Sequence, residues 1–269
     1  MPVLALHGWL DNAASFDRLA PLLVEAHPEI DLVALDLPGH GQSDHRPAGI
    51  NQYFIDYVPV VMQVVRALGW DRFALLGHSL GAGIATLVAG TFPERILFVL
   101  LVDGFGPMSD RPEQAPGRLR DAIEEIWKEE GRPARPGRAY SSIGQAVGVR
   151  RRTGKLSEES ARLLVERGMR RSVKGYVWRS DARLKTPSAT RLTEEQVRAF
   201  LSAIQCPVCV VFADDSEFVQ LAELVRPRLK LLPQLESHTL SGGHHLHMEN
   251  PGGVAGVFSE FISRGSGDP

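Results

Sequence analysis

The sequence contains little cysteine, no long apolar run and almost no net charge. Two cysteines, Cys206 and Cys209, cannot build a disulfide scaffold. Their C-P-V-C spacing begins a strand-like run instead of a helix, which favours core packing over redox chemistry. The longest uninterrupted apolar run, Ile96–Val102, is too short to cross a bilayer. A net charge of −2 gives no general reason to expect nucleic acid or membrane partners.

A secretory leader is also missing from the pattern, because Met1 runs directly into a strand-like segment. We therefore expect a cytoplasmic location. The length of 269 residues is sufficient for one large α/β domain with an insertion. The sequence does not indicate an oligomeric state.

Short apolar runs alternate with segments of helical periodicity. The strand-like runs are Val3–Leu6, Leu32–Leu35, Phe73–Leu76, Ile96–Val102 and Val208–Phe212, with a weaker last one at Gln234–Leu240. The helical segments are Phe16–Ala26, Tyr53–Leu68, Gly81–Phe92, Phe218–Arg226 and a last one at Gly252–Ile262. This alternation predicts an α/β fold with a doubly wound, mainly parallel sheet.

The interval from residue 105 to residue 203 interrupts the alternation. Its helix-like pieces are Gln114–Glu130, Ser157–Gly168 and Thr193–Ser202. We interpret residues 105–203 as an inserted helical cap on a core made of residues 1–104 and 204–269. The insertion has 21 Lys and Arg against 13 Asp and Glu, whereas the remainder has 9 against 19. A basic cap on an acidic core would favour docking and could attract anionic substrates, but we favour a solvated, arginine-rich helical surface as the explanation of this charge.

Ser79 stands between a strand-like run and a helix-like one, with Gly77 and Gly81 on either side. This G-x-S-x-G arrangement is typical of a tight turn that exposes a nucleophilic serine above the edge of a sheet. A serine hydroxyl needs a base and an oxyanion site to react. The strand before Ser79 and the helix after it provide the context that the motif requires, so we interpret Ser79 as a nucleophile.

The base is expected near the end of the chain, in the segment "SGGHHLHMENP". His244 follows Gly243 directly and would take the proton of Ser79 and return it to the leaving group. His245 and His247 are competing candidates. A histidine cluster can also bind metal, but no carboxylate or cysteine set with ligand spacing accompanies this one. We therefore predict no metal site.

The segment "LALHGWLDN" follows the first strand-like run. It is either a plain loop or the second half of an oxyanion hole. In the second case, the backbone N–H groups of Trp9 and Leu80 would surround the tetrahedral intermediate. The Trp9 ring would add an apolar wall.

Four segments in this order, "HGWLDNAASFD", "LDLPGHGQSD", "GHSLGAG" and "GGHHLHMENP", resemble the α/β-hydrolase superfamily. "HGWLDNAASFDRL" and "WRSDARLKTPSATRLTEEQV" are more narrowly similar to the serine hydrolase-like proteins of that superfamily. The resemblance implies a Ser–acid–His triad, no cofactor, and acyl-ester hydrolysis without a defined substrate. Our leading hypothesis is a serine hydrolase that cleaves small carboxylic esters or thioesters through an acyl-enzyme. The resemblance assigns catalysis to Ser79 and His244, and the oxyanion donors to Trp9 and Leu80.

The acid of the triad is ambiguous in this sequence. Superfamily members usually have a strand followed by G-x-x-D, and in "PVCVVFADDSEF" simple counting puts Ser216 in place of that Asp. Asp215 is one residue early. Asp103, at the end of Ile96–Val102, is the alternative, because some members have the acid after that strand. We favour Asp215.

The resemblance also implies two further strands before the one that ends in "HG". Since this chain begins inside that strand, we expect the first two strands to be absent and the first strand present to form a bare sheet edge.

Serine at the nucleophile position argues against dehalogenase and epoxide hydrolase chemistry, which need a carboxylate. Within the fold, a carbon–carbon bond hydrolase, a perhydrolase or an aminopeptidase is an alternative to an esterase. A function of a different class is non-catalytic binding of a small ligand under the cap. The absence of an acid at the usual spacing is the main argument for that binder.

Overall fold

A six-stranded sheet forms the centre of the computed structural model, which describes residues 1–47, 52–130, 139–216 and 221–265. Its strands are β1 (Pro2–Leu6), β2 (Asp31–Leu35), β3 (Phe73–His78), β4 (Ile96–Val102), β7 (Val208–Asp215) and β8 (Leu235–Gly243). Their order is β2-β1-β3-β4-β7-β8, and every neighbouring pair is parallel. The parallel α/β sheet that the alternating pattern predicts is therefore confirmed.

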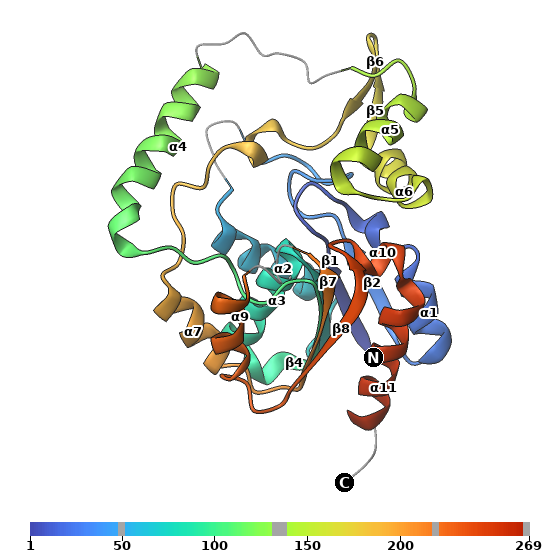
Figure 1. Ribbon diagram of the computed structural model, residues 1–269, viewed down its shortest axis with the longest axis vertical. Coiled ribbons are helices and arrows are strands. Elements are labelled where there is room, and N and C mark those ends of the chain that lie inside the picture. The colour runs from blue at the N-terminus through green and yellow to red at the C-terminus, as the bar shows by residue number, and fades with distance from the viewer. Residues whose placement is uncertain (48–51, 131–138, 217–220, 266–269) are drawn as a thin grey trace.

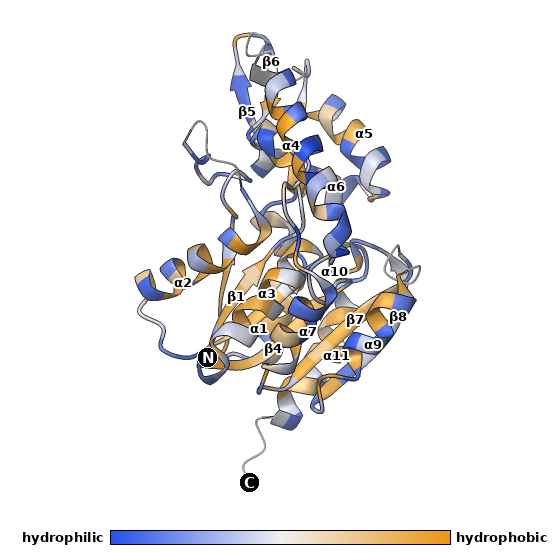
Figure 2. Cartoon of the chain, turned by 90° about the vertical axis from the view of Figure 1, so that its left-hand side faces the viewer, coloured by the Kyte–Doolittle hydropathy of each residue, from blue (hydrophilic) through white to orange (hydrophobic). Residues whose placement is uncertain are grey.

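Helices cover both faces of this sheet (Figure 1). One face carries α1 (Leu19–Ala26) and α11 (Pro251–Gly265), and the other carries α2 (Tyr57–Ala67), α3 (Leu80–Thr91), α7 (Glu194–Ser202) and α9 (Ala222–Leu229). Successive strand residues point to opposite faces. Leu4 and Leu6 of β1 accordingly join the core under α2 and α3, whereas Val3 and Ala5 join the core under α1 and α11. Strands that are buried on both faces are hydrophobic along their length, and Figure 2 shows the strands of this sheet mainly in the hydrophobic colour.

The expectation that the first strand forms a bare edge is wrong. β1 pairs with β2 over Pro2–Leu6 and with β3 over Val3–Leu6, so it lies inside the sheet. Among the described residues, the edge on that side is β2. After β1 the chain passes through α1 and forms β2 on the side of β1 opposite β3. The backbone groups on that side of β1 are therefore hydrogen-bonded to β2.

The insertion, residues 105–203, has all of its described helices except α7 beyond the end of the sheet where β3, β4 and β7 finish (Figure 1). It contains α4 (Ala115–Glu130), α5 (Ile143–Gly154), α6 (Glu158–Gly168) and a hairpin of β5 (Met169–Ser172) and β6 (Gly175–Trp178). α5, α6 and the hairpin share a small apolar cluster that the core residue Met248 enters. The pattern did not predict α5 or the hairpin.

The last helix of the insertion, α7, belongs to the core by its packing. Val197 and Leu201 of α7 are buried in the larger apolar cluster together with residues of α3. Gly90 of α3 makes this contact possible, because a Cβ at that position would lie 2.2 Å from the carbonyl oxygen of Phe200. The remaining insertion elements stand outside this cluster.

Both cysteines are buried and unpaired. Burial raises the pKa of Cys206 to about 11 and that of Cys209 to about 12, so both thiols stay protonated at neutral pH. Their role in core packing, which the sequence favours, is confirmed.

Candidate active site

Ser79 lies on a strained turn between β3 and α3. Its backbone φ of 51° and ψ of −109° fall outside the regions that residues with a side chain normally occupy. The flanking glycines make the turn possible, because a Cβ on Gly77 would lie 2.6 Å from the Cα of Ala82, and one on Gly81 would lie 1.9 Å from the carbonyl oxygen of Leu6. The turn holds Ser79 half-buried at the carboxyl edge of the sheet.

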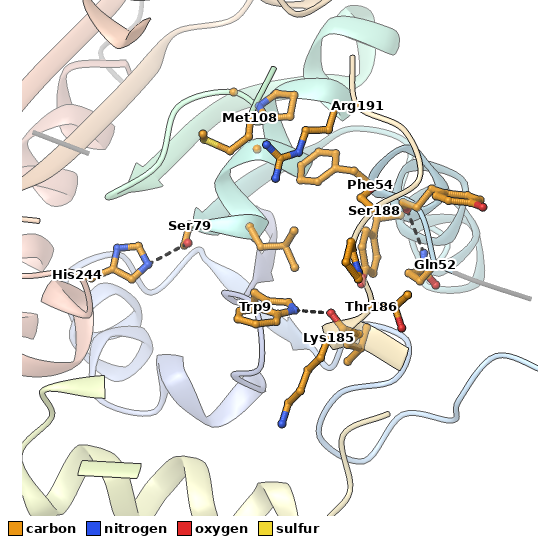
Figure 3. A pocket seen from close by; sticks show the side chains of 18 of the residues that line it. Trp9, Gln52, Phe54, Ser79, Met108, Lys185, Thr186, Ser188, Arg191 and His244 are labelled. Carbon is orange, nitrogen blue, oxygen red and sulfur yellow. Dashed lines mark hydrogen bonds between the residues drawn. The ribbon is translucent and has the colours of Figure 1, made fainter. Parts of the chain in front are cut away.

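A chain of hydrogen bonds connects three side chains that come from three strand ends. Nδ1 of His244 lies 2.6 Å from Oδ2 of Asp103, and Nε2 of His244 lies 3.0 Å from Oγ of Ser79. A carboxylate can only accept, so Nδ1 carries the proton and Nε2 accepts from the Ser79 hydroxyl. Asp103 is fully buried, whereas the side chain of His244 is 38% exposed and can meet a ligand (Figure 3).

The acid beside His244 is therefore Asp103, and the preference for Asp215 is corrected. β7 continues through Asp215 instead of ending near Phe212, so Asp215 is a strand residue that pairs with Gly243, and it is exposed. Asp103 follows β4 directly, with a positive φ of 42° that turns its side chain toward β7 and β8. Asp214 accepts from the backbone N–H of Gly242 at 2.9 Å and supports the segment before His244.

Ser216 is a neighbour of the acid that the sequence analysis missed. Its hydroxyl donates to Oδ1 of Asp103 at 2.8 Å, and the backbone N–H of Ala213 donates to the same oxygen at 3.1 Å. These two donors hold one carboxylate oxygen and leave Oδ2 for His244. The signal was present in the sequence, since Ser216 occupies the position where counting from β7 would put the family's Asp.

His78 supports the backbone of His244. Its Nε2 donates to the carbonyl oxygen of His244 at 2.8 Å. The ring of His78 is fully buried, and this burial, together with His247 and the other histidines, lowers its pKa well below the usual value. His78 therefore stays neutral, and the single proton that it needs for this bond is on Nε2.

Buried Asp11 lies under the histidine cluster and connects the core with the insertion. It accepts from Nε2 of His245 at 3.2 Å and also pairs with Arg150 of α5. Burial alone would raise the pKa of Asp11, but His245 and Arg150 outweigh burial and lower it. The two histidines that competed with His244 as candidate bases are thus accounted for elsewhere: His245 binds Asp11, and His247 is buried against Phe16 and His78.

The loop after β1 lies against the nucleophile turn. A Cβ on Gly8 would lie 2.8 Å from Nδ1 of His78, so only glycine allows this approach. Trp9 follows, with a side chain that is 53% exposed and an indole N–H that donates to the carbonyl oxygen of Leu184 at 3.0 Å. Leu80 is the first residue of α3, and the first N–H groups of a helix have no partner within the helix.

These groups open onto a cavity of about 1140 Å³ between the core and the insertion. Ser79, His244 and Trp9 line one part of it, as Figure 3 shows. Aromatic and apolar side chains line another part: Tyr53, Phe54, Tyr57, Met108 and Leu192. A cavity of this size accommodates an organic ligand much larger than an acetyl ester.

The described residues contain neither a metal-binding cluster nor a membrane-spanning helix. In that part of the chain, no cluster of three or more His, Cys, Asp or Glu side chains is arranged to hold a metal ion. Over the same residues, no helix has both the length and the apolar character needed to cross a membrane.

Comparison with known proteins places this geometry in a family. The model of the α/β-hydrolase fold matches residues 1–251. A serine hydrolase-like protein of Dictyostelium discoideum is 32% identical over 273 residues, which cover 97% of this chain and 74% of that protein. The chain belongs to the α/β-hydrolase family and, within it, to the serine hydrolase-like proteins.

Solved structures agree with this assignment. The crystal structure of a hypothetical protein from Pseudomonas aeruginosa PAO1 is similar with a TM-score of 0.89 and 42% identity, covering 98% of this chain and 92% of that one. A thioesterase domain from the curacin biosynthetic pathway is similar with a TM-score of 0.82 and 26% identity, covering 95% and 89%. The chain is therefore a hydrolase by family.

Proposed function

We propose that this protein hydrolyses carboxylic esters or thioesters, with Ser79 as nucleophile, His244 as general base and acid, and Asp103 as the acid of the triad. The observation that carries the proposal is the hydrogen-bonded chain from Asp103 through His244 to Ser79, with distances of 2.6 and 3.0 Å, at the wall of a large cavity. Similarity to a thioesterase domain supports including thioesters.

The reaction follows from this geometry. Nε2 of His244 takes the proton as Oγ of Ser79 attacks the carbonyl carbon, and the carbonyl oxygen becomes an oxyanion. The backbone N–H groups of Trp9 and Leu80 stabilise that oxyanion. His244 then gives the proton to the departing alcohol or thiol, which leaves an acyl group on Ser79. Water, activated by His244 in the same way, releases the carboxylic acid and restores the serine.

Asp103 holds the imidazole in the tautomer that the reaction needs. Its buried carboxylate accepts from Nδ1 and also stabilises the imidazolium that forms when Nε2 takes the proton. In this proposal the insertion acts as a cap, because it covers the cavity on the side away from the sheet. Asp103 also removes the main argument for a non-catalytic binder, which was the lack of an acid at the usual spacing.

Replacement of the nucleophile tests the proposal. We expect Ser79→Ala to lower kcat for p-nitrophenyl butyrate and for a butyryl thioester by about 10³-fold or more. Ser237→Ala, which removes an exposed serine hydroxyl from β8, is the matched control and should retain wild-type kcat. Retention of most activity by folded Ser79→Ala would exclude Ser79 as the nucleophile.

A further inference from the structure

The wall of the cavity contains a cation, Arg191, that forms no ion pair with any carboxylate among the described residues. Arg191 lines the cavity, and within the described residues it makes no hydrogen bond and no ion pair. The carboxylate of Asp110 raises the pKa of Arg191, but hydrogen bonds from other groups already occupy both oxygens of Asp110. Oδ2 of Asp110 accepts from Nε of Arg118 at 2.5 Å, and Oδ1 accepts from the backbone N–H of Arg111 at 3.0 Å.

The surroundings of Arg191 disfavour its charge. Partial burial comes first and the positive charge of Arg118 second, and together they lower the pKa of Arg191 although Asp110 opposes them. An arginine remains protonated at neutral pH even so. Residual positive charge in a half-enclosed site attracts an anion, and the planar guanidinium matches the two oxygens of a carboxylate.

The other cations at the cavity differ from Arg191 in their environment. Arg183 is occupied by the carboxylate of Asp181 and by the carbonyl oxygens of Pro47 and Arg46. Lys185 extends away from the group formed by Phe54, Met108 and Arg191 in Figure 3. Lys155 is an exposed residue at the end of α5.

Apolar side chains lie beside Arg191 in the wall of the cavity that Ser79 also lines. Phe54 lies against α3 one turn after Ser79, since a Cβ on Gly83 would be 2.8 Å from its ring. Met108, which is 43% exposed, lies on the same side of the cavity, and Figure 3 shows the guanidinium of Arg191 beside these two side chains. A ligand bound at Ser79 can therefore reach both apolar side chains and a cation within the same cavity.

We propose that Arg191 binds a terminal carboxylate on the acyl chain of the substrate, so that the preferred substrates are half-esters or half-thioesters of dicarboxylic acids. This inference rests on the proposed function, since it assigns the acyl group that is transferred to Ser79. Arg191 is then the residue that determines specificity, and the aromatic and methionine side chains bind the methylene groups between the two carbonyl carbons.

The kinetic test compares p-nitrophenyl half-esters of the diacids from succinate to sebacate with analogues whose terminal carboxylate is replaced by a carboxamide. At low ionic strength we expect kcat/KM for the best acid to exceed that of its amide by about tenfold or more, because a hydrogen-bonded ion pair is lost in the amide. The preference should decrease with added salt.

Variants identify the residue responsible. Arg191→Gln should abolish the preference for the acid while retaining activity on the amide, and Arg191→Lys should restore part of it. Arg171→Gln is the charge-matched control, since Arg171 is exposed on β5 and does not line the cavity. Equal kcat/KM for acid and amide in the wild type, or an unchanged preference in Arg191→Gln, would overturn the inference while leaving the proposed function intact.

Two further measurements are needed. One shows whether the recognised carboxylate lies on the acyl or the alcohol side of the ester, and the other tests the anion site independently of hydrolysis. A preference for charge on the alcohol side, tested with butyryl esters of ω-hydroxy acids and their amides, would overturn the assignment to the acyl chain. Calorimetric binding of the best free diacid to Ser79→Ala requires no turnover. Binding that Arg191→Gln weakens about tenfold would support the anion site even if no ester were hydrolysed, whereas equal binding to Ser79→Ala with and without Arg191→Gln would contradict it.

Discussion

The hydroxyl of Ser216 donates to Oδ1 of Asp103 at 2.8 Å, and this bond connects the two strand ends that compete to supply the acid. The family usually has its Asp after the strand that corresponds to β7. In this chain β7 supplies a serine there, and β4 supplies the carboxylate. The serine contacts the carboxylate that takes over the role of the missing Asp.

Asparagine substitutions separate the two acids. In Asp103→Asn the amide oxygen can keep its bonds from Ala213 and Ser216, so the amide NH₂ faces Nδ1 of His244. This geometry favours the wrong imidazole tautomer, and we expect kcat to fall by about 10³- to 10⁴-fold. Asp215→Asn, in which an exposed carboxylate is lost, should change kcat by less than about twofold. A strong defect in Asp215→Asn with normal turnover in Asp103→Asn would restore the assignment that the structure corrects.

Loss of the Ser216 hydroxyl should have a smaller effect. Asp103 retains the N–H of Ala213 in Ser216→Ala, so we expect kcat to fall by about threefold to tenfold, with KM almost unchanged. The measurement is steady-state hydrolysis of p-nitrophenyl butyrate, and Ser237→Ala on β8 is the control. Wild-type kcat in Ser216→Ala would show that the bond to Asp103 does not help to position the acid.

Arg228 of α9 provides a prediction about stability. It is 1% exposed, pairs with Glu194 at 2.6 Å, and donates to the carbonyl oxygens of Phe105 and Pro107 at 3.2 and 2.9 Å. Arg228→Met removes the donor of both carbonyl oxygens and leaves Glu194 with the Ser109 hydroxyl alone, so we expect unfolding in urea to need about 2–3 kcal/mol less free energy.

Arg226→Met is the control for Arg228→Met, because Arg226 is exposed on the same helix. It should change the free energy of unfolding by less than about 0.5 kcal/mol. Similar losses in the two variants would indicate that the helix, not the buried donor network, determines the effect.

The contact between Asp36 and Arg167 predicts a dependence of stability on pH. Burial alone would raise the pKa of Asp36, but hydrogen bonds from Arg167 and from the N–H groups of Ala13 and Gln42 outweigh burial and lower it. A carboxylate with a lowered pKa stabilises the fold above its ordinary pKa, and this contribution is lost as the pH falls through the folded value.

We therefore expect Arg167→Gln to lower the free energy of unfolding by about 1 kcal/mol at pH 7. The difference from wild type should shrink as the pH falls below the ordinary pKa of an aspartate, about 3.9, toward the lower pKa that Asp36 has in the folded protein. Arg162→Gln, which loses only exposed ion pairs on the same helix, should cost less than about 0.5 kcal/mol at either pH. A difference for Arg167→Gln that is constant from pH 7 to pH 3 would contradict the account.

The parallel sheet could be predicted from the sequence because its strands are buried on both faces and form uninterrupted apolar runs. Ile96–Val102 matches β4 at both ends. The carboxyl end of β7 could not be predicted, since Asp214 and Asp215 interrupt the apolar pattern while the backbone continues the pairing with β8. Because β7 continues past Phe212, Asp215 is a strand residue and does not lie in the loop after the strand. Counting residues from Phe212 to locate the acid was therefore misleading.

Ser79 and His244 could be found because a tight turn and a late histidine leave local signatures. The choice of Asp103 depends on which strand ends meet in space, and adjacent residues do not encode that choice. The contacts of Asp11 with Arg150 and of Arg228 with Glu194 could not be predicted for the same reason, because the partners are far apart in the sequence. Phe218–Arg226 was expected as one helix; its first residues lie outside the described part of the chain, and α9 begins at Ala222.

Covalent labelling of the purified protein with a fluorophosphonate tests the central claim most directly, since the reagent reacts only with a serine activated by its base and oxyanion site. The account predicts one added phosphonyl group, located on the peptide that contains Ser79, with labelling abolished in Ser79→Ala and strongly slowed in Asp103→Asn. Labelling should proceed at the wild-type rate in Asp215→Asn. Failure of the folded wild type to label, or labelling at another residue, would contradict the claim that Ser79, His244 and Asp103 form an active triad.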